Sequence, residues 1–168
     1  MSICIWPLFY NSIKISVENL VLKAALRLLK YRSRSCIELR TRLTQKGFSI
    51  ISIEKTIDYL LELNYLDDLK FAKSFVEDKI NQKGVGPIYL KSELLKHGIP
   101  QNQISIIISE AYEVHSKDQL IKKHIEKRKN ALIDKSSENQ KRKIINFLQR
   151  KGFSWNQISS HIDESFHY

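Results

Sequence analysis

A short motif that occurs three times constrains the fold of this chain more than any other feature of its sequence. It reads QKGFSIISI around Gly47, KHGIPQNQI around Gly98 and RKGFSWNQI around Gly152. These glycines are 51 and 54 residues apart, close to the spacing of a repeated supersecondary unit. Apolar residues stand eight and four positions before each glycine and one, six and ten positions after it: Leu39, Leu90 and Ile144; Leu43, Leu94 and Leu148; Phe48, Ile99 and Phe153; Ile53, Ile104 and Ile158; Ile57, Ile108 and Ile162. We therefore expect one structural unit to be used three times.

Each copy of the motif predicts a turn between two helices. A helix that ends in a Schellman or αL cap needs a residue with positive φ, and glycine adopts that conformation without steric cost. The apolar residue after the glycine can fold back onto the helix, as Phe48 onto Leu43. Ser49, Pro100 or Ser154 can then begin the next helix, and the last of these has the S-x-x-Q spacing of a capping box.

A further helix is predicted before each pair, because apolar residues recur at steps of three and four over 17–31, 68–82 and 116–133. The chain has 5 glycines and 3 prolines, fewer than a strand-rich fold usually requires. The sequence thus predicts an all-α fold, a tandem array of three three-helix repeats that is elongated and curved because small units share surface with their neighbours. The predicted segments are an apolar N-terminal arm at 1–16 and repeats at 17–65, 66–115 and 116–168.

The first ten residues, MSICIWPLFY, are apolar but lack a basic n-region and are too short to span a bilayer. We interpret them as a frayed or surface-docked arm; a secretory signal and a wrongly assigned start codon are the alternatives. Cys4 and Cys36 have neither CxxC spacing nor a nearby histidine, so neither a zinc site nor a disulfide framework is expected. The chain is expected to be a cytoplasmic monomer without membrane association.

Positive charge is concentrated in two blocks of a chain whose formal net charge is +10. Residues 23–46 hold eight Lys/Arg against one acid, 117–151 hold twelve against four, and 47–116 are net acidic. This division favours two surfaces for a polyanion or an acidic protein, with ordinary solvated helix surface as the alternative. The candidate partner-binding residues are Arg32, Arg34, Arg40, Arg42, Lys46, Lys122, Lys123, Lys127, Arg128, Lys129, Lys141, Arg142, Lys143, Arg150 and Lys151.

No pattern of catalytic, cofactor-binding or metal-ligating residues is found, so we do not expect an enzyme. The adjacent Asp67 and Asp68 are better explained as the cap and first turn of a helix. The G-x-G at 84–86 lacks a preceding strand and the lysine of a phosphate loop, which favours a linker. The five histidines form no HExxH motif. Trp155 can stack on a partner or pack on its own repeat, and packing is favoured.

A helix-turn-helix DNA reader has the same apolar spacing as the third motif, but it places cations on the helix that follows the turn. Here that helix is poor in cations: only Lys55 is basic over 49–65, and 100–116 and 154–168 contain no Lys or Arg. The charge lies before the turns instead. Backbone-type contact with DNA, or with a protein–DNA complex, is therefore favoured over base-specific reading. An adaptor unrelated to nucleic acid stays open as a third class.

Three stretches of sequence together carry a resemblance to a known family. ALRLLKYRSRSCIELRTRLTQKGF, YLDDLKFAKSFVEDKINQKGVGPIYLKSELLKHGI and KRKIINFLQRKGFSWNQI, in that order, resemble the RecX family of bacterial regulators of the RecA recombinase. The resemblance covers about residues 20–164. Asn64 replaces the glycine usual before YLDD, and Tyr89 stands where a basic residue is common. Residues that match family motif positions are Arg32, Arg34, Glu38, Leu39, Asp67, Asp68, Glu93, Leu94, Gly152 and Phe153.

The resemblance implies three tandem three-helix repeats in a curved, modular protein of the cytoplasm. It also implies binding to RecA–DNA filaments along their groove, with inhibition of strand exchange, ATPase and coprotease activities, and hence an effect on recombination, DNA repair and the SOS response. Some members of the family bind single- or double-stranded DNA directly. The family has no catalytic residues or cofactors to carry over. The rival hypothesis is a stand-alone helical DNA- or RNA-binding protein that acts through phosphate contacts.

Overall fold

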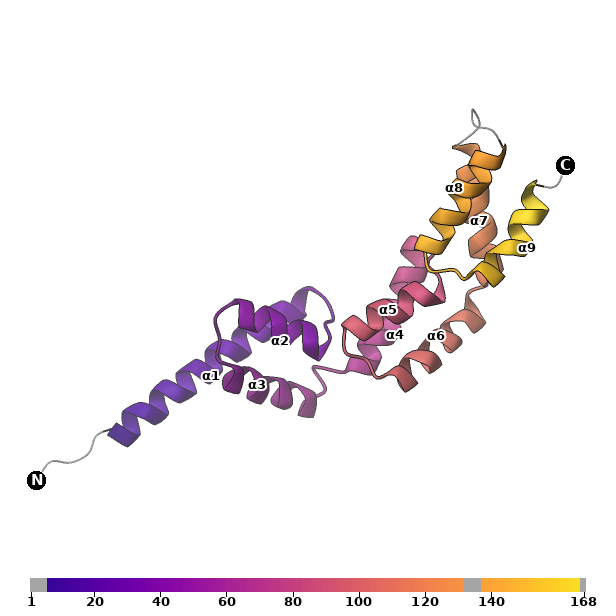
Figure 1. The fold of residues 1–168 in the computed structure, drawn as a ribbon. Coiled ribbons are helices and arrows are strands. Elements are labelled where there is room, and N and C mark those ends of the chain that lie inside the picture. The colour runs from indigo at the N-terminus through magenta and orange to yellow at the C-terminus, as the bar shows by residue number, and fades with distance from the viewer. Residues whose placement is uncertain (1–5, 132–136, 167–168) are drawn as a thin grey trace, which may run out of the picture. The chain divides into compact units, whose positions relative to one another are not determined.

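The structure, a computed structural model, describes residues 6–131 and 137–166, with the side chains of 6–18 and 137 left undescribed. Within these ranges the only regular elements are helices (Figure 1). They are α1 (Trp6–Tyr31), α2 (Cys36–Gln45), α3 (Ile50–Glu62), α4 (Asp68–Lys83), α5 (Pro87–Lys96), α6 (Gln101–Val114), α7 (Lys117–Asn130), α8 (Ser137–Arg150) and α9 (Trp155–Phe166). The predicted all-α fold of three consecutive three-helix repeats is confirmed.

Two helix boundaries differ from the prediction. The first helix, expected from residue 17, begins at Trp6, so most of the predicted apolar arm continues α1 as helix. Residues 1–5 of that arm lie outside the described residues. The seventh helix ends at Asn130, and its predicted last residues, 132–133, also lie outside them.

All three predicted turns have the backbone conformation that the motif requires. Gly47, Gly98 and Gly152 have φ of 84°, 80° and 91°. At the first turn, Phe48 N–H donates to the Leu43 carbonyl at 3.4 Å and Gly47 N–H to the Thr44 carbonyl at 2.9 Å, and the other two turns repeat this pair of bonds. These are the two hydrogen bonds of a Schellman motif, so the predicted caps are confirmed.

Side chains predicted to cap helix N-termini form the expected hydrogen bonds. Asp67 Oδ1 accepts a hydrogen bond from Lys70 N–H at 2.9 Å, as expected of an N-cap. Asp68 reaches further and accepts from Cys36 N–H at 2.8 Å, which satisfies a free donor in the first turn of α2. Gln157 Oε1 accepts from Ser154 N–H at 2.9 Å, one half of the predicted capping box. The adjacent carboxylates are therefore structural.

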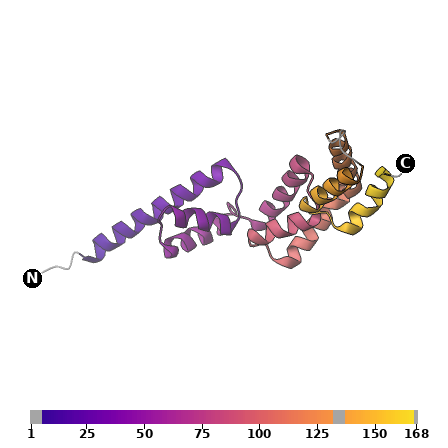
Figure 2. The same ribbon diagram turned by 45° about the horizontal axis from the view of Figure 1, so that its top comes forward.

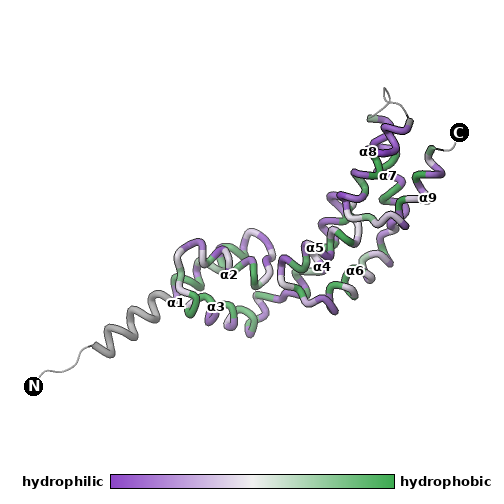
Figure 3. Tube along the Cα trace, viewed as in Figure 1, coloured by the Kyte–Doolittle hydropathy of each residue, from purple (hydrophilic) through white to green (hydrophobic). Residues whose placement is uncertain are grey.

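The motif's apolar positions form the cores of the repeats. Thirteen of the fifteen aligned residues are buried, and the exceptions are Phe48 and Ile108, which are half-buried. In the second repeat Ile107, one position earlier, takes the buried place that Ile108 was expected to fill. Figure 3 shows apolar residues recurring in short bands along the helices, as expected of helices with one buried face.

The chain divides into two compact units, Met1–Phe71 and Ala72–Tyr168. The core of the first unit joins α1, α2 and α3 through Val21, Leu39, Leu43 and Ile53, among others. In the second unit, Ile121, Leu148 and Ile158 belong to a core in which α7, α8 and α9 meet (Figures 1 and 2). The second unit thus contains the whole third repeat and nearly all of the second.

Candidate polyanion-binding site

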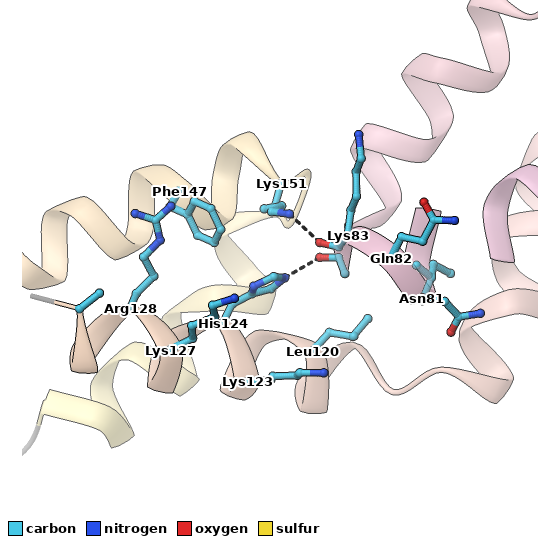
Figure 4. A pocket seen from close by; sticks show the side chains of 13 residues that line it. Asn81, Gln82, Lys83, Leu120, Lys123, His124, Lys127, Arg128, Phe147 and Lys151 are labelled. Atoms are coloured by element: carbon cyan, nitrogen blue, oxygen red, sulfur yellow. Dashed lines mark hydrogen bonds between the residues drawn. The ribbon is translucent and has the colours of Figure 1, made fainter. Parts of the chain in front are cut away.

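A cleft within the second unit gathers cations from two repeats. It lies where the C-terminal end of α4 meets α7 and α8, and its volume is about 560 Å³. Figure 4 shows the side chains of α7 and α8 that point toward the end of α4. Among residues 19–131 and 138–166, none of those that line the cleft carries a carboxylate. The basic residues that line it are Lys83, Lys123, His124, Lys127, Arg128 and Lys151.

Two of these basic side chains bind the carbonyl groups at the end of α4 (Figure 4). Nε2 of His124 lies 2.7 Å from the Gly84 carbonyl oxygen, and Lys151 Nζ donates to the Lys83 carbonyl at 2.5 Å. The last carbonyls of a helix lack partners within it and carry partial negative charge, so donors from the third repeat satisfy them. This contact fixes one wall of the cleft to the other.

The backbones of the two repeats also touch directly. Gly86 N–H donates to the Lys151 carbonyl at 2.7 Å, and Ile88 N–H donates to the Gly152 carbonyl at 3.0 Å. A Cβ atom on Gly86 would lie 2.3 Å from the Gly152 carbonyl oxygen, which leaves no room for a side chain. The G-x-G, interpreted from sequence as a linker, therefore also allows close packing between repeats.

Burial and the repulsion of neighbouring cations lower the pKa of both donor side chains. Burial lowers the pKa of Lys151, and the charges of Lys83, Arg128 and Lys127 lower it further. Burial likewise lowers the pKa of His124; its hydrogen bond to Gly84 opposes this, and nearby lysines reinforce it. Neighbouring cations thus contribute to both shifts, as expected where positive charges gather.

The aromatic ring of Phe147 packs against two cations of the cleft. The guanidinium carbon of Arg128 lies 3.9 Å from the centre of the Phe147 ring, and Lys151 Nζ lies 5.5 Å from it. Cation–π attraction of this kind holds charged groups in place without neutralising them. The ring also contacts His124 edge-on at 5.4 Å between centroids.

Three of the predicted arginines of the first repeat form ion pairs with glutamates of the same repeat. Arg32 and Arg34 both bind the carboxylate of Glu38. Burial opposes ionisation of Glu38, but the hydrogen bonds and charges of the two arginines lower its pKa overall. Arg40 forms a bidentate ion pair with Glu54, in which Nε and Nη2 donate to the two carboxylate oxygens at 2.6 and 2.7 Å. Arg42 and Lys46 are exposed.

The remaining predicted residues of the third repeat divide into paired and unpaired cations. Lys122 lies 3.6 Å from Glu164 and Lys141 lies 3.4 Å from Asp163, while Lys129 donates to the Ser165 carbonyl at 2.5 Å. Lys143 is exposed. Arg142 and Arg150 are exposed and make no ion pair with any residue of 19–131 or 138–166. The structure therefore brings Lys123, Lys127, Arg128 and Lys151 together in the cleft. The other predicted residues lie elsewhere.

Sequence reasoning missed Lys83 and His124 as members of the site. Lys83 lies in the net acidic middle block, and His124 showed no metal or catalytic pattern. Lys83 and His124 lie in the same cleft only because the second and third repeats pack against each other, and no spacing in the sequence indicates that packing. Elsewhere, no group of metal-ligating side chains occurs among the described residues. None of the described helices is both long and apolar enough to cross a membrane.

These features define an all-α protein of tandem three-helix repeats with a cationic cleft in its second unit. The first, second and third three-helix domains of RecX match residues 22–60, 67–106 and 117–162. The regulatory protein RecX of Chlorobaculum tepidum is 36% identical over 141 residues, covering 84% of this chain and 85% of that protein. RecX of Vibrio parahaemolyticus is 34% identical over 137 residues, covering 82% and 86%.

A solved structure extends the agreement to three dimensions. The crystal structure of RecX from Lactobacillus salivarius superposes with a TM-score of 0.72 and 27% sequence identity, covering 89% of this chain and 97% of that one. The chain belongs to the RecX family, a family of regulatory proteins. The resemblance stated from the sequence motifs is confirmed.

Proposed function

We propose that this protein binds RecA–DNA filaments in the cytoplasm as a monomer and inhibits the recombinase, ATPase and coprotease activities of RecA. Through this inhibition it affects recombination, DNA repair and the SOS response. Membership of a family of regulatory proteins supports a role that acts through binding. The observation that carries the proposal is the group of cations in repeat 3 that no acid of the described chain neutralises.

The exposed charge of the third repeat suits the surface of a nucleoprotein filament. Such a filament offers DNA phosphates and acidic protein side chains at regular intervals. Arg142 and Arg150 on α8, together with Lys123 and Lys127 of the cleft, present positive charge that no acid among the described residues pairs with. Several weak contacts along successive subunits add up to tight binding, since later contacts form within one complex.

The test is an ATPase and strand-exchange assay of RecA with the protein added in substoichiometric amounts. We expect both activities to fall. The paired variant Arg142→Glu with Arg150→Glu should weaken the effect, because it removes two exposed cations without breaking any ion pair within the described chain. A matched control, Lys70→Glu with Lys91→Glu, changes charge equally on exposed positions of α4 and α5. Unchanged RecA activities at every ratio of protein to RecA would refute the proposal.

A second candidate function is direct binding of DNA or RNA without RecA, which the same unneutralised cations favour. Binding to bare single-stranded DNA, bare duplex and RecA-coated strand at one salt concentration separates the two. Preference for the coated strand supports filament binding. Equal or greater affinity for bare nucleic acid supports the second candidate. Cations that serve either partner act on phosphates and carry no base specificity.

A further inference from the structure

The cationic cleft carries more charge than the contacts within the chain require. Lys83, Lys123 and Lys127 are exposed at its rim and make no ion pair with any residue of 19–131 or 138–166. Lys151 lies deeper, and the charges around it lower its pKa. Cations held together in this way repel one another, so an anion that enters the cleft relieves the repulsion and gains several attractions at once.

The shape of the cleft favours a compact ligand over an extended one. Its volume of about 560 Å³ lies inside the range of roughly 300 to 1,000 Å³ usual for small-molecule sites. Cations reach it from three segments: Lys83 from α4, Lys123 and Lys127 from α7, and Lys151 from the turn after α8. A nucleic-acid strand spreads single charges along its length, whereas a chain of linked phosphates concentrates several charges in one place. The concentrated anion matches this arrangement better.

The aromatic ring in the cleft is not available to stack on a base. Arg128 covers Phe147 at 3.9 Å, and His124 contacts the ring from its edge. The polar groups left at the rim are the exposed amides of Asn81 and Gln82, which can donate hydrogen bonds to phosphate oxygens. The cleft is therefore built to recognise phosphate and not a nucleobase.

We propose that this cleft is a regulatory binding site for a small polyphosphate anion, with the triphosphate group of a nucleotide as the ligand class. Lys83 of the second repeat would bind the same phosphate chain as Lys123 and Lys127 of the third repeat. The ligand thus bridges the two repeats and stabilises their junction. This inference goes beyond filament binding, because it concerns a small, saturable ligand of the regulator itself.

Binding at this site takes up protons. His124 faces Lys123 and Lys127 of α7, Lys151 in the turn after α8 and the Gly84 carbonyl that follows α4. Burial and the surrounding cations lower the pKa of His124, and a bound anion raises it again by favouring the imidazolium form. Affinity for the anion therefore increases as pH falls below the ordinary histidine value of about 6.5 toward the lowered pKa of His124, and this increase is smaller when His124 is replaced by glutamine.

The probe is inorganic tripolyphosphate, titrated calorimetrically into the full chain at fixed, near-physiological ionic strength. We expect one saturable site per chain. The variant Lys123→Gln with Lys127→Gln should weaken binding by about tenfold or more, because two direct charge contacts are lost. The control Lys70→Gln with Lys91→Gln removes the same charge from exposed positions outside the cleft and should change affinity less than about twofold, as screening predicts. Circular dichroism establishes that each variant remains folded.

Two further ligands separate the sources of phosphate. Adenosine triphosphate should compete with tripolyphosphate, and a short single-stranded oligonucleotide at equal phosphate concentration should compete more weakly. Equal loss of affinity in the cleft and control variants would overturn the proposal, as would an oligonucleotide that binds the cleft more tightly than tripolyphosphate. Binding to the RecA–DNA filament is measured separately, so failure here leaves the proposed function standing.

Discussion

Replacement of Gly152 by alanine tests how the second and third repeats are joined. Gly152 has φ of 91°, a conformation that costs an L-residue about 1 to 2 kcal/mol. Its added Cβ would lie 2.3 Å from Tyr89 N and 2.5 Å from Tyr89 Cβ, so the backbone of α5 has to move. Overpacking of this kind costs typically about 1 to 3 kcal/mol. The expected loss of unfolding free energy in the second unit is therefore about 2 to 5 kcal/mol.

Gly47 provides a matched control. It occupies the same place in the first Schellman motif with φ of 84°, but nothing lies within 4 Å of its added Cβ. Gly47→Ala should therefore cost only the conformational part, about 1 to 2 kcal/mol. Hydrogen exchange measures both, because it reports local free energies for each compact unit separately.

The exchange experiment has a second, more local readout. Gly152→Ala should remove protection from the amides of Gly86 and Ile88, which donate to the carbonyls of Lys151 and Gly152. Equal losses for the two alanine variants, or protection of these two amides that survives in Gly152→Ala, would refute the reasoning that close backbone packing requires this glycine.

Three further predictions follow from packing, protonation and charge. Leu148→Ala, at a fully buried position of the third core, should cost about 2 to 5 kcal/mol in chemical denaturation, and a loss below about 1 kcal/mol would contradict its place in that core. Burial first, and then neighbouring lysines, lower the pKa of His124, so its contribution to stability is complete above the unfolded value of about 6.5 and is lost as pH falls toward the folded pKa. Thermal unfolding between pH 7 and 5 should accordingly show a steeper loss in the natural protein than in His124→Gln, and identical slopes would contradict this. Affinity for a RecA–DNA filament should weaken as salt concentration rises, as measured by fluorescence anisotropy, and a flat dependence would contradict a phosphate-directed interface.

The repeat architecture could be predicted from the sequence because the turn in each repeat depends only on residues that are close together in the chain. A helix that ends at Gly47, Gly98 or Gly152 needs a residue with positive φ followed by an apolar one, and these requirements involve only near neighbours. Burial of one helix face likewise imposes a period of three and four residues. At the aligned apolar positions, the structure differs from the prediction only in single residues. In α6, Ile107 is buried in place of Ile108, because the packing of neighbouring helices decides which residues of the apolar face are covered.

The candidate site was only partly predictable, since charge is visible in a sequence but pairing is not. Arg32, Arg34 and Arg40 looked like partner-binding cations until the fold placed Glu38 and Glu54 against them. Lys122 and Lys141 similarly meet carboxylates of α9. An ion pair forms between residues that folding brings within about 4 Å, whatever their separation along the chain.

The sequence by itself determined the number of repeats, their helices and the glycine-ended turns, since all of these follow from hydrogen bonding and burial over a few residues. Tertiary structure alone decided which cations stay unneutralised. Lys83 and Lys151 are 68 residues apart in the chain, and they meet because two glycines let the backbones of adjacent repeats approach to hydrogen-bonding distance. The cleft therefore arises from packing between repeats, where long-range contacts and not local propensity fix the positions of the charges.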